Sequence, residues 1–205
     1  MDKKTLHRIG IFIYNDAEVL DFSGPFEVFC TAKRLIDNKL LPMEVLLIAE
    51  STETVVARGS FHVTPHFSIH DHPPLTTLIV AGGLHAEVMH NRKVQGWLQQ
   101  QSKIVENCAS VCTGAFLLAA AGIVDKHTVT THWEDLQDLQ QQYPQLQVLE
   151  GKRWVEAQTD RPRIVTSGGI SAGIDMSLYL LSLIADSALA IKTATQMEFD
   201  WRTND

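Results

Sequence analysis

The sequence predicts an α/β protein in which helices cover both faces of a mostly parallel central sheet. Short runs rich in Ile, Val and Phe alternate with helical segments along most of the 205-residue chain, and this order is typical of parallel strands joined by right-handed crossovers. The length suits one domain, so we expect residues 1–205 to fold together. Two short β-prone runs joined by turn residues also predict a small β-hairpin outside the sheet.

The composition narrows the class of protein. Hydrophobic residues make up 45% of the chain and charged residues 20%, as in ordinary globular domains. No apolar run is long enough to span a bilayer and no secretion signal is visible, so we expect a cytoplasmic protein without membrane contact. A net charge of −7 without clustered Lys or Arg argues against nucleic acid as a partner. The three cysteines form no C-x-x-C pair, which argues against a thiolate zinc site.

The first strand is expected from Arg8 to Tyr14 and is followed by a helix in which Ser23 acts as the cap and Pro25 lies in the first turn. Asp21 then precedes the helix, beyond the carboxyl end of the strand, where ligands of open α/β sheets bind. An aspartate in apolar surroundings is either a backbone cap or a carboxyl with a raised pKa. The cap is the simpler interpretation.

Met43 to Ala49 predicts a second buried strand, and Glu53 to Ile69 predicts the hairpin, with its turn at residues 58–60. The hairpin region is rich in histidine, a common zinc ligand. However, two of these histidines alternate with apolar residues and two lie in a polar loop, so we expect no physiological metal at His62, His66, His70 and His72.

Leu75 to Gly83 predicts a strand that ends in a glycine pair. Such glycines bring backbone N–H groups close to a ligand, so Gly82 and Gly83 are candidate anion-hole donors, or else an ordinary turn. A surface helix over Arg92–Gln101 is expected to lead into the next strand, Lys103–Cys108.

Cys112 lies between that strand and an alanine-rich helix, which we expect over Phe116–Ala121. Small residues two positions away on each side, Ser110 and Gly114, are typical of a nucleophile elbow. In this interpretation the sulfur is exposed, the helix lowers the thiol pKa, and Gly114 helps to bind an anion. The alternative is an inert cysteine buried in a tight turn.

His132 follows a short β-prone run and precedes a helix, so it is the most plausible imidazole to approach Cys112, although a lone histidine before a helix is more often a cap or a core hydrogen-bonder. Strands are expected over Gln145–Ala157 and Arg163–Ser167, and a last helix over Ala188–Phe199.

A glycine-rich segment, residues 168–173, opens a long apolar helix and suggests close backbone packing, with Gly169 and Ile170 as candidate ligand contacts. Because the carboxyl ends of parallel strands meet at one edge of a sheet, Asp21, the Gly82–Gly83 turn and Cys112 should converge there.

Five segments in order, LDFSGPFEVF, IVAGG, SVCTGAFLLAAAG, TTHW and SGGISAGIDMSLYL, resemble the ThiJ/PfpI family of class I glutamine amidotransferase-like proteins, and within it the isonitrile hydratase subgroup. The resemblance implies a flavodoxin-like sandwich and a homodimer. It also implies that Cys112 is the nucleophile, Asp21 the acid/base carboxyl and Thr113 a nearby hydroxyl, acting without a cofactor on a small electrophilic substrate.

Thr113 stands where peptidase-like members of the family carry histidine, which argues against hydrolysis by an adjacent Cys-His pair. No helix-turn-helix module is expected after the domain. The hypothesis is therefore an isonitrile hydratase-like lyase that forms a Cys112 thioimidate. The alternatives are a redox-responsive protein whose Cys112 is oxidised, a glyoxalase-like enzyme acting on oxoaldehydes, and a small-molecule-binding protein without chemistry.

Overall fold

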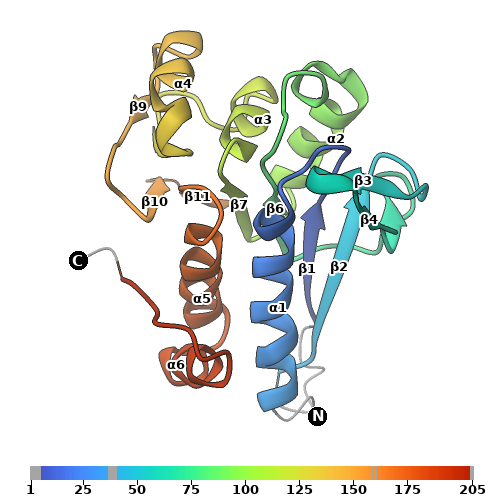
Figure 1. Cartoon of the computed structure of the whole chain (residues 1–205), viewed down its shortest axis with the longest axis vertical. Coiled ribbons are helices and arrows are strands. Elements are labelled where there is room, and N and C mark those ends of the chain that lie inside the picture. The colour runs from blue at the N-terminus through green and yellow to red at the C-terminus, as the bar shows by residue number, and fades with distance from the viewer. Residues whose placement is uncertain (1–5, 37–40, 158, 160, 204–205) are drawn as a thin grey trace.

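The protein is built around a seven-stranded sheet with the order β10-β11-β7-β6-β1-β2-β5 (Figure 1). The computed structural model describes residues 6–36, 41–157, 159 and 161–203. All neighbours in this sheet pair in parallel except β10, which is antiparallel to β11. The mostly parallel sheet predicted from the sequence is therefore confirmed. Its strands are β1 (His7–Phe12), β2 (Met43–Ala49), β5 (Phe67–Ser68), β6 (Thr77–Val80), β7 (Asn107–Val111), β10 (Trp154–Ala157) and β11 (Arg163–Ser167).

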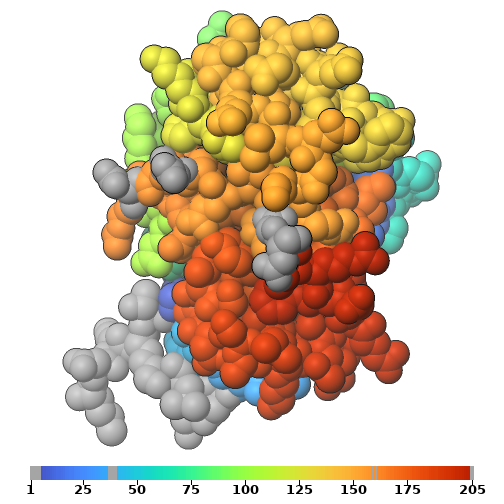
Figure 2. Space-filling model, turned by 90° about the vertical axis from the view of Figure 1, so that its left-hand side faces the viewer, coloured from blue at the N-terminus to red at the C-terminus, as the bar shows by residue number. Residues whose placement is uncertain are grey.

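Helices cover both faces of the sheet. On one face α1 (Val19–Leu35) packs against α5 (Ala172–Ile184) and α6 (Ser187–Gln196), and on the other α2 (Arg92–Ser102) contacts α3 (Gly114–Ala120) (Figure 1). A smaller unit of α4 (Leu136–Gln142) with the strands β8 (Thr128–Val129) and β9 (Gln147–Val148) completes the fold. Figure 2 shows this unit, in yellow and orange, above the red helices α5 and α6.

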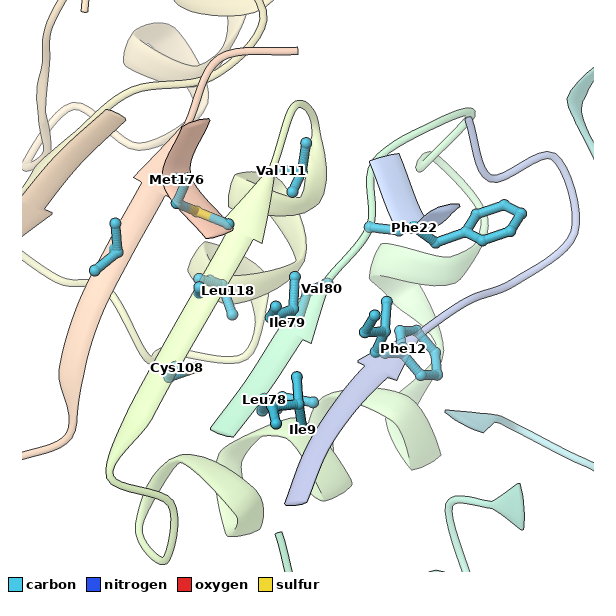
Figure 3. Packing of buried hydrophobic residues seen from close by; sticks show 14 of the residues in the cluster. Ile9, Phe12, Phe22, Leu78, Ile79, Val80, Cys108, Val111, Leu118 and Met176 are labelled. Carbon is cyan, nitrogen blue, oxygen red and sulfur yellow. The ribbon is translucent and has the colours of Figure 1, made fainter. Parts of the chain in front are cut away.

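The core lies between the helices and the central strands. Ile11 of β1, Ile79 of β6 and Ala109 of β7 are side by side in register, and none of them is exposed. Figure 3 shows apolar side chains of the same three strands packed with Leu118 of α3 and Met176 of α5. Strands buried on both faces need nearly continuous apolar runs, which is why these segments were visible in the sequence.

The predicted hairpin excursion is present. It consists of β3 (Val55–Ala57) and β4 (Phe61–Val63), joined by a short 3-10 turn, Arg58–Ser60, and it forms a sheet of its own. Two backbone hydrogen bonds hold it on the loop that follows β1: Asp16 N–H donates to Val56 O at 2.8 Å, and Arg58 N–H donates to Ala17 O at 3.0 Å. The hairpin therefore reaches the carboxyl edge of the main sheet.

The expected start of the first helix is wrong. α1 begins at Val19, so Asp21 lies inside its first turn and Pro25 inside the helix, and Ser23 is not its cap. The start is fixed from outside the helix, because the N–H of the capping residue Glu18 donates to Gly82 O at 2.9 Å.

The observed bounds of two other strands differ from those expected. The segment 103–105 is taken up by the C-terminal turn of α2, where Lys103 N–H bonds Gln100 O and Ile104 N–H bonds Gln101 O, so β7 runs from Asn107 to Val111 instead of from Lys103 to Cys108. The expected strand Gln145–Ala157 is two strands, β9 and β10, in different sheets. Two further 3-10 turns, Val88–His90 and Trp133–Asp135, precede α2 and α4.

Two of the four histidines in the histidine-rich region accept hydrogen bonds from other segments. His66 Nδ1 accepts the Leu47 N–H at 2.8 Å, and His72 Nε2 accepts the Trp97 indole N–H at 2.8 Å. Within the described residues, no three His, Cys, Asp or Glu side chains gather as metal ligands would. Over the same part of the chain, no helix has both the length and the apolar character to cross a membrane.

Candidate active site

Cys112 lies in a strained turn between β7 and α3. Its φ angle is 56°, in the left-handed region that non-glycine residues seldom occupy. Its N–H is shared between Ser167 O and Gly168 O, both at 3.2 Å, which ties the turn to the end of β11. At Gly114, the first residue of α3, a Cβ atom would lie 2.3 Å from Val80 O. The tight elbow expected from the small flanking residues is therefore present.

Asp21 lies behind the cysteine and is fully buried. Its carboxylate accepts the Gly82 N–H at 3.2 Å and the Ile170 N–H at 2.9 Å, and the Cys112 side chain lies beside it. Because these partners lie outside α1 and the N-cap residue of that helix is Glu18, the interpretation of Asp21 as the cap of its helix is wrong. Burial raises the pKa of Asp21 to about 6, against the opposing effect of its hydrogen bonds to Ile170, Cys112 and Gly82.

The Cys112 side chain is less exposed than expected, since only 7% of the residue is accessible. Burial raises the pKa of its thiol well above the usual range, and the negative charge of Asp21 raises it further, while the Thr113 N–H opposes both. The expectation of an exposed sulfur with a lowered pKa is therefore wrong. Burial and the neighbouring carboxylate thus both favour the protonated thiol.

Gly82 allows these groups to meet. A Cβ atom at this position would lie 2.7 Å from Asp21 Oδ2, from Cys112 Cβ and from Thr113 N. Real Cβ atoms do not approach so closely, so only glycine fits between the carboxylate and the elbow.

Two hydrogen bonds connect the Thr113 side chain to the backbone of Gly83. Its hydroxyl accepts the Gly83 N–H at 2.8 Å and donates to Gly83 O at 2.9 Å. The N–H groups of Gly82 and Gly83 thus both have acceptors inside the protein. Thr113 positions the turn through these two hydrogen bonds.

A cavity of about 370 Å³ opens over the sulfur. Its walls combine the elbow with acidic, basic and apolar side chains from distant segments: Glu18, Arg58, Gly83, Leu84, His85, Cys112, Thr113, His132, Glu134, Asp135 and Ile170. Cys112 lines this cavity, and Asp21 lies behind it.

His132 and Gly169 lie on the far side of the sulfur. A Cβ atom at Gly169 would be 2.4 Å from His132 Cδ2 and 3.2 Å from Cys112 Sγ, so glycine brings the imidazole and the thiol close. However, His132 Nδ1 accepts the Glu134 N–H at 3.4 Å and lies 3.4 Å from Asp135 Oδ2. The histidine is a cap for the turn that leads into α4, and it forms a wall of the cavity.

Ile170 is close to Asp21 through its backbone. Its φ angle of 56° turns its N–H toward the carboxylate, and its side chain is 42% exposed in the cavity wall. The segment that opens α5 is therefore part of the site, as expected from its glycines.

Several residues of the site were not expected from the sequence, among them Tyr14, His85 and Arg58. The Tyr14 hydroxyl at the end of β1 is buried beside Thr113, Asp21 and Cys112, and its pKa is raised by that burial. His85 packs its ring 4.3 Å from that of Phe116, and burial lowers its pKa, which keeps the imidazole neutral. Arg58 enters from the hairpin. The position of Tyr14 at a carboxyl strand end was a usable signal, whereas the other two have no local pattern.

Comparison with known proteins assigns the chain to a family. The DJ-1/PfpI family matches residues 7–183. The isonitrile hydratase of Pseudomonas putida is 27% identical over 193 residues, which cover 94% of this chain and 78% of that enzyme. The HTH-type transcriptional regulator GbdR of Pseudomonas aeruginosa is 28% identical over 173 residues, 84% of this chain but only 45% of the regulator.

Solved structures show the same fold at lower identity. A THiJ/PfpI family protein from Pseudomonas syringae superimposes with a TM-score of 0.81 at 22% identity, covering 100% of this chain and 81% of that protein. Drosophila melanogaster DJ-1beta superimposes with a TM-score of 0.78 at 16% identity, covering 96% of this chain and 100% of that one. The flavodoxin-like arrangement is common to all of them, and the chain belongs to the DJ-1/PfpI family.

Proposed function

We propose that this protein is a cofactor-independent hydratase that adds water to small isonitriles and releases N-substituted formamides. The observation that carries the proposal is the juxtaposition of the Cys112 side chain and the buried Asp21 carboxylate on either side of Gly82, beneath an open cavity. It supplies a nucleophile and a proton relay in direct contact. Similarity to the Pseudomonas putida isonitrile hydratase supports the same chemistry.

In the first step the sulfur attacks the terminal carbon of R–N≡C and a C–S bond forms. As the sulfur attacks, its proton passes to Asp21, and the resulting carboxylic acid delivers that proton to the same carbon. The product is a thioimidate, R–N=CH–S–Cys112. Because the pKa of Asp21 is about 6, the carboxylate can accept this proton near neutral pH and give it up again.

In the second step water attacks the thioimidate carbon. Asp21 takes a proton from the water and passes it to the imine nitrogen, which gives R–NH–CH(OH)–S–Cys112 and restores the carboxylate. Collapse of this adduct breaks the C–S bond, releases R–NH–CHO and returns a proton to the sulfur. Overall one water is consumed and the thiol–carboxylate pair is restored.

The hydrogen bonds already made by the backbone N–H groups near Cys112 favour addition to a carbon electrophile over acyl hydrolysis. Hydrolysis of an ester or amide builds an oxyanion that needs preorganised N–H donors, and those of Gly82 and Gly83 are occupied by Asp21 and Thr113. Addition to an isonitrile instead needs a proton delivered at the carbon attacked. A buried thiol with a raised pKa also argues against a redox sensor, because the thiolate is the form that is oxidised.

A second candidate function is ligand binding without turnover. It is favoured by the similarity to the regulator GbdR, which combines a region of this kind with further sequence. In this case the cavity over Cys112 would bind a small molecule and release it unchanged.

The proposal is tested by incubating the purified protein with a panel of alkyl and aryl isonitriles and, separately, with α-oxoaldehydes. We expect formamides from the isonitriles, and none from Cys112→Ala, while Cys30→Ala controls for the loss of a thiol elsewhere. Turnover of oxoaldehydes alone would replace the proposed reaction with a glyoxalase-like one. Stabilisation of the protein by a panel member without any product would favour ligand binding.

A further inference from the structure

We propose that Arg58 makes this cavity a site for electrophiles that carry a carboxylate group. The inference deepens the proposed function by naming its substrate class, and it rests on that function only for the nature of the reacting carbon. It starts from a feature that catalysis by Cys112 and Asp21 leaves unused: a guanidinium in the wall of the same cavity.

The hairpin holds Arg58 in place. Its turn is anchored by two buried residues, Val55 and Ala57, which are 5% and 1% exposed. The Arg58 N–H donates to Ala17 O at 3.0 Å, and Ala17 in turn forms a β-bridge with Gly83 beside the elbow. The backbone of Arg58 is thereby fixed at the catalytic edge.

The guanidinium is free to bind. Its closest acidic partner is Glu18, with Nε and Oε2 3.9 Å apart, and no hydrogen bond joins the guanidinium to another residue in the part of the chain that the structure describes. Its five N–H donors are therefore available to a substrate. A planar fork of donors matches a carboxylate in bidentate geometry, which a lysine ammonium does not.

The other charges of the cavity divide into two groups. Glu134 and Asp135 lie 3.7 and 3.4 Å from His132 Nδ1, on the histidine side of the cavity. Glu18 is on the side of Arg58 and competes with an incoming anion at 3.9 Å, without the short contacts of a strong pair. An anionic group is thus accepted at Arg58 and repelled by Glu134 and Asp135, which gives the substrate one orientation.

The proposal can be tested without isonitrile turnover, because iodoacetate and iodoacetamide differ only in a carboxylate. Either reagent forms a C–S bond at Cys112, releases iodide and leaves the thiol proton on Asp21 or water. The rate constant at Cys112 is measured for each reagent by peptide mass spectrometry, and the ratio of the two is compared between the wild type and Arg58→Met. Arg92→Met, at an exposed position on α2, is the matched control.

We expect the iodoacetate-to-iodoacetamide ratio to fall about tenfold in Arg58→Met, as for the loss of a charge-assisted hydrogen bond, and to stay at the wild-type value in Arg92→Met. Glu18→Gln should raise the ratio, because it removes the competing carboxylate. An equal ratio in the wild type and Arg58→Met would overturn the proposal.

A second measurement does not depend on the reactivity of the thiol. Butyrate should raise the unfolding temperature of the wild type more than butyramide, and this difference should vanish in Arg58→Met. If Cys112 reacts with neither reagent, equal stabilisation by butyrate and butyramide overturns the proposal. A preference for iodoacetate in a protein that hydrates no isonitrile would reject the hydratase and retain the carboxylate site.

Discussion

Ionisation of Asp21 should destabilise the folded protein in a defined pH range. Its pKa is raised from 3.8 to about 6, so between these values the folded chain holds a proton that the unfolded chain has released. Stability gained from the protonated carboxyl is therefore present below pH 4 and is lost as the pH rises through 6. This increase in the pKa of Asp21 corresponds to about 3 kcal/mol in the free energy of unfolding. Screening by solvent does not reduce the value, because Asp21 is fully buried.

Asp21→Asn removes this titration while keeping the size of the side chain. Urea unfolding of both proteins at several pH values between 4 and 7.5 gives the difference in their free energies of unfolding, wild type minus variant. We expect that difference to fall by about 3 kcal/mol as the pH increases. Asp138→Asn, at an exposed position on α4, controls for the loss of a carboxylate. A difference that stays constant or increases with pH would refute the assignment of a raised pKa to Asp21.

Three further predictions follow from the same geometry. The kcat/KM for an isonitrile should decrease below about pH 6, where Asp21 becomes protonated and can no longer accept the thiol proton; an activity that is flat from pH 5 to 8 would contradict this. Iodoacetamide should label Cys112 slowly at pH 7 and faster with each step to higher pH, because the thiol pKa is raised; rapid labelling that is independent of pH between 6 and 8 would contradict it. Gly82→Ala, which places a Cβ atom 2.7 Å from Asp21 Oδ2, should reduce isonitrile turnover at least tenfold in a protein that remains folded by circular dichroism, whereas Gly96→Ala, with open space around its Cβ position, should retain it.

The sheet and the location of the site could be predicted because their signals are local. Apolar runs such as Met43–Ala49 mark strands buried on both faces, and the observed bounds of β2 match the prediction. The elbow at Cys112 required small neighbours, and Gly114 shows why, since it abuts Val80 O. Once the strands were ordered, the common edge for Asp21, Gly82 and Cys112 followed from the fold class.

The electrostatics of the site could not be predicted in this way. Whether Asp21 caps a helix or holds a proton depends on N–H groups supplied by Gly82 and Ile170, the second of which lies 149 residues away in the chain. The thiol pKa depends on burial by segments that meet only in the folded protein, which reversed the effect expected from the helix end alone. Arg58 reaches the cavity because its hairpin folds over the sheet edge, and no local pattern encodes that placement.

The central claim is that Cys112 adds to the isonitrile carbon while Asp21 carries the proton. The most direct measurement is rapid-quench mass spectrometry of the protein mixed with an excess of a simple alkyl isonitrile, with formamide quantified in the same samples. We expect a transient adduct of one isonitrile per chain, located at Cys112, that forms and decays at rates matching formamide release. Neither adduct nor formamide should arise in Cys112→Ala, whereas formamide production by that variant at the wild-type rate would contradict the claim.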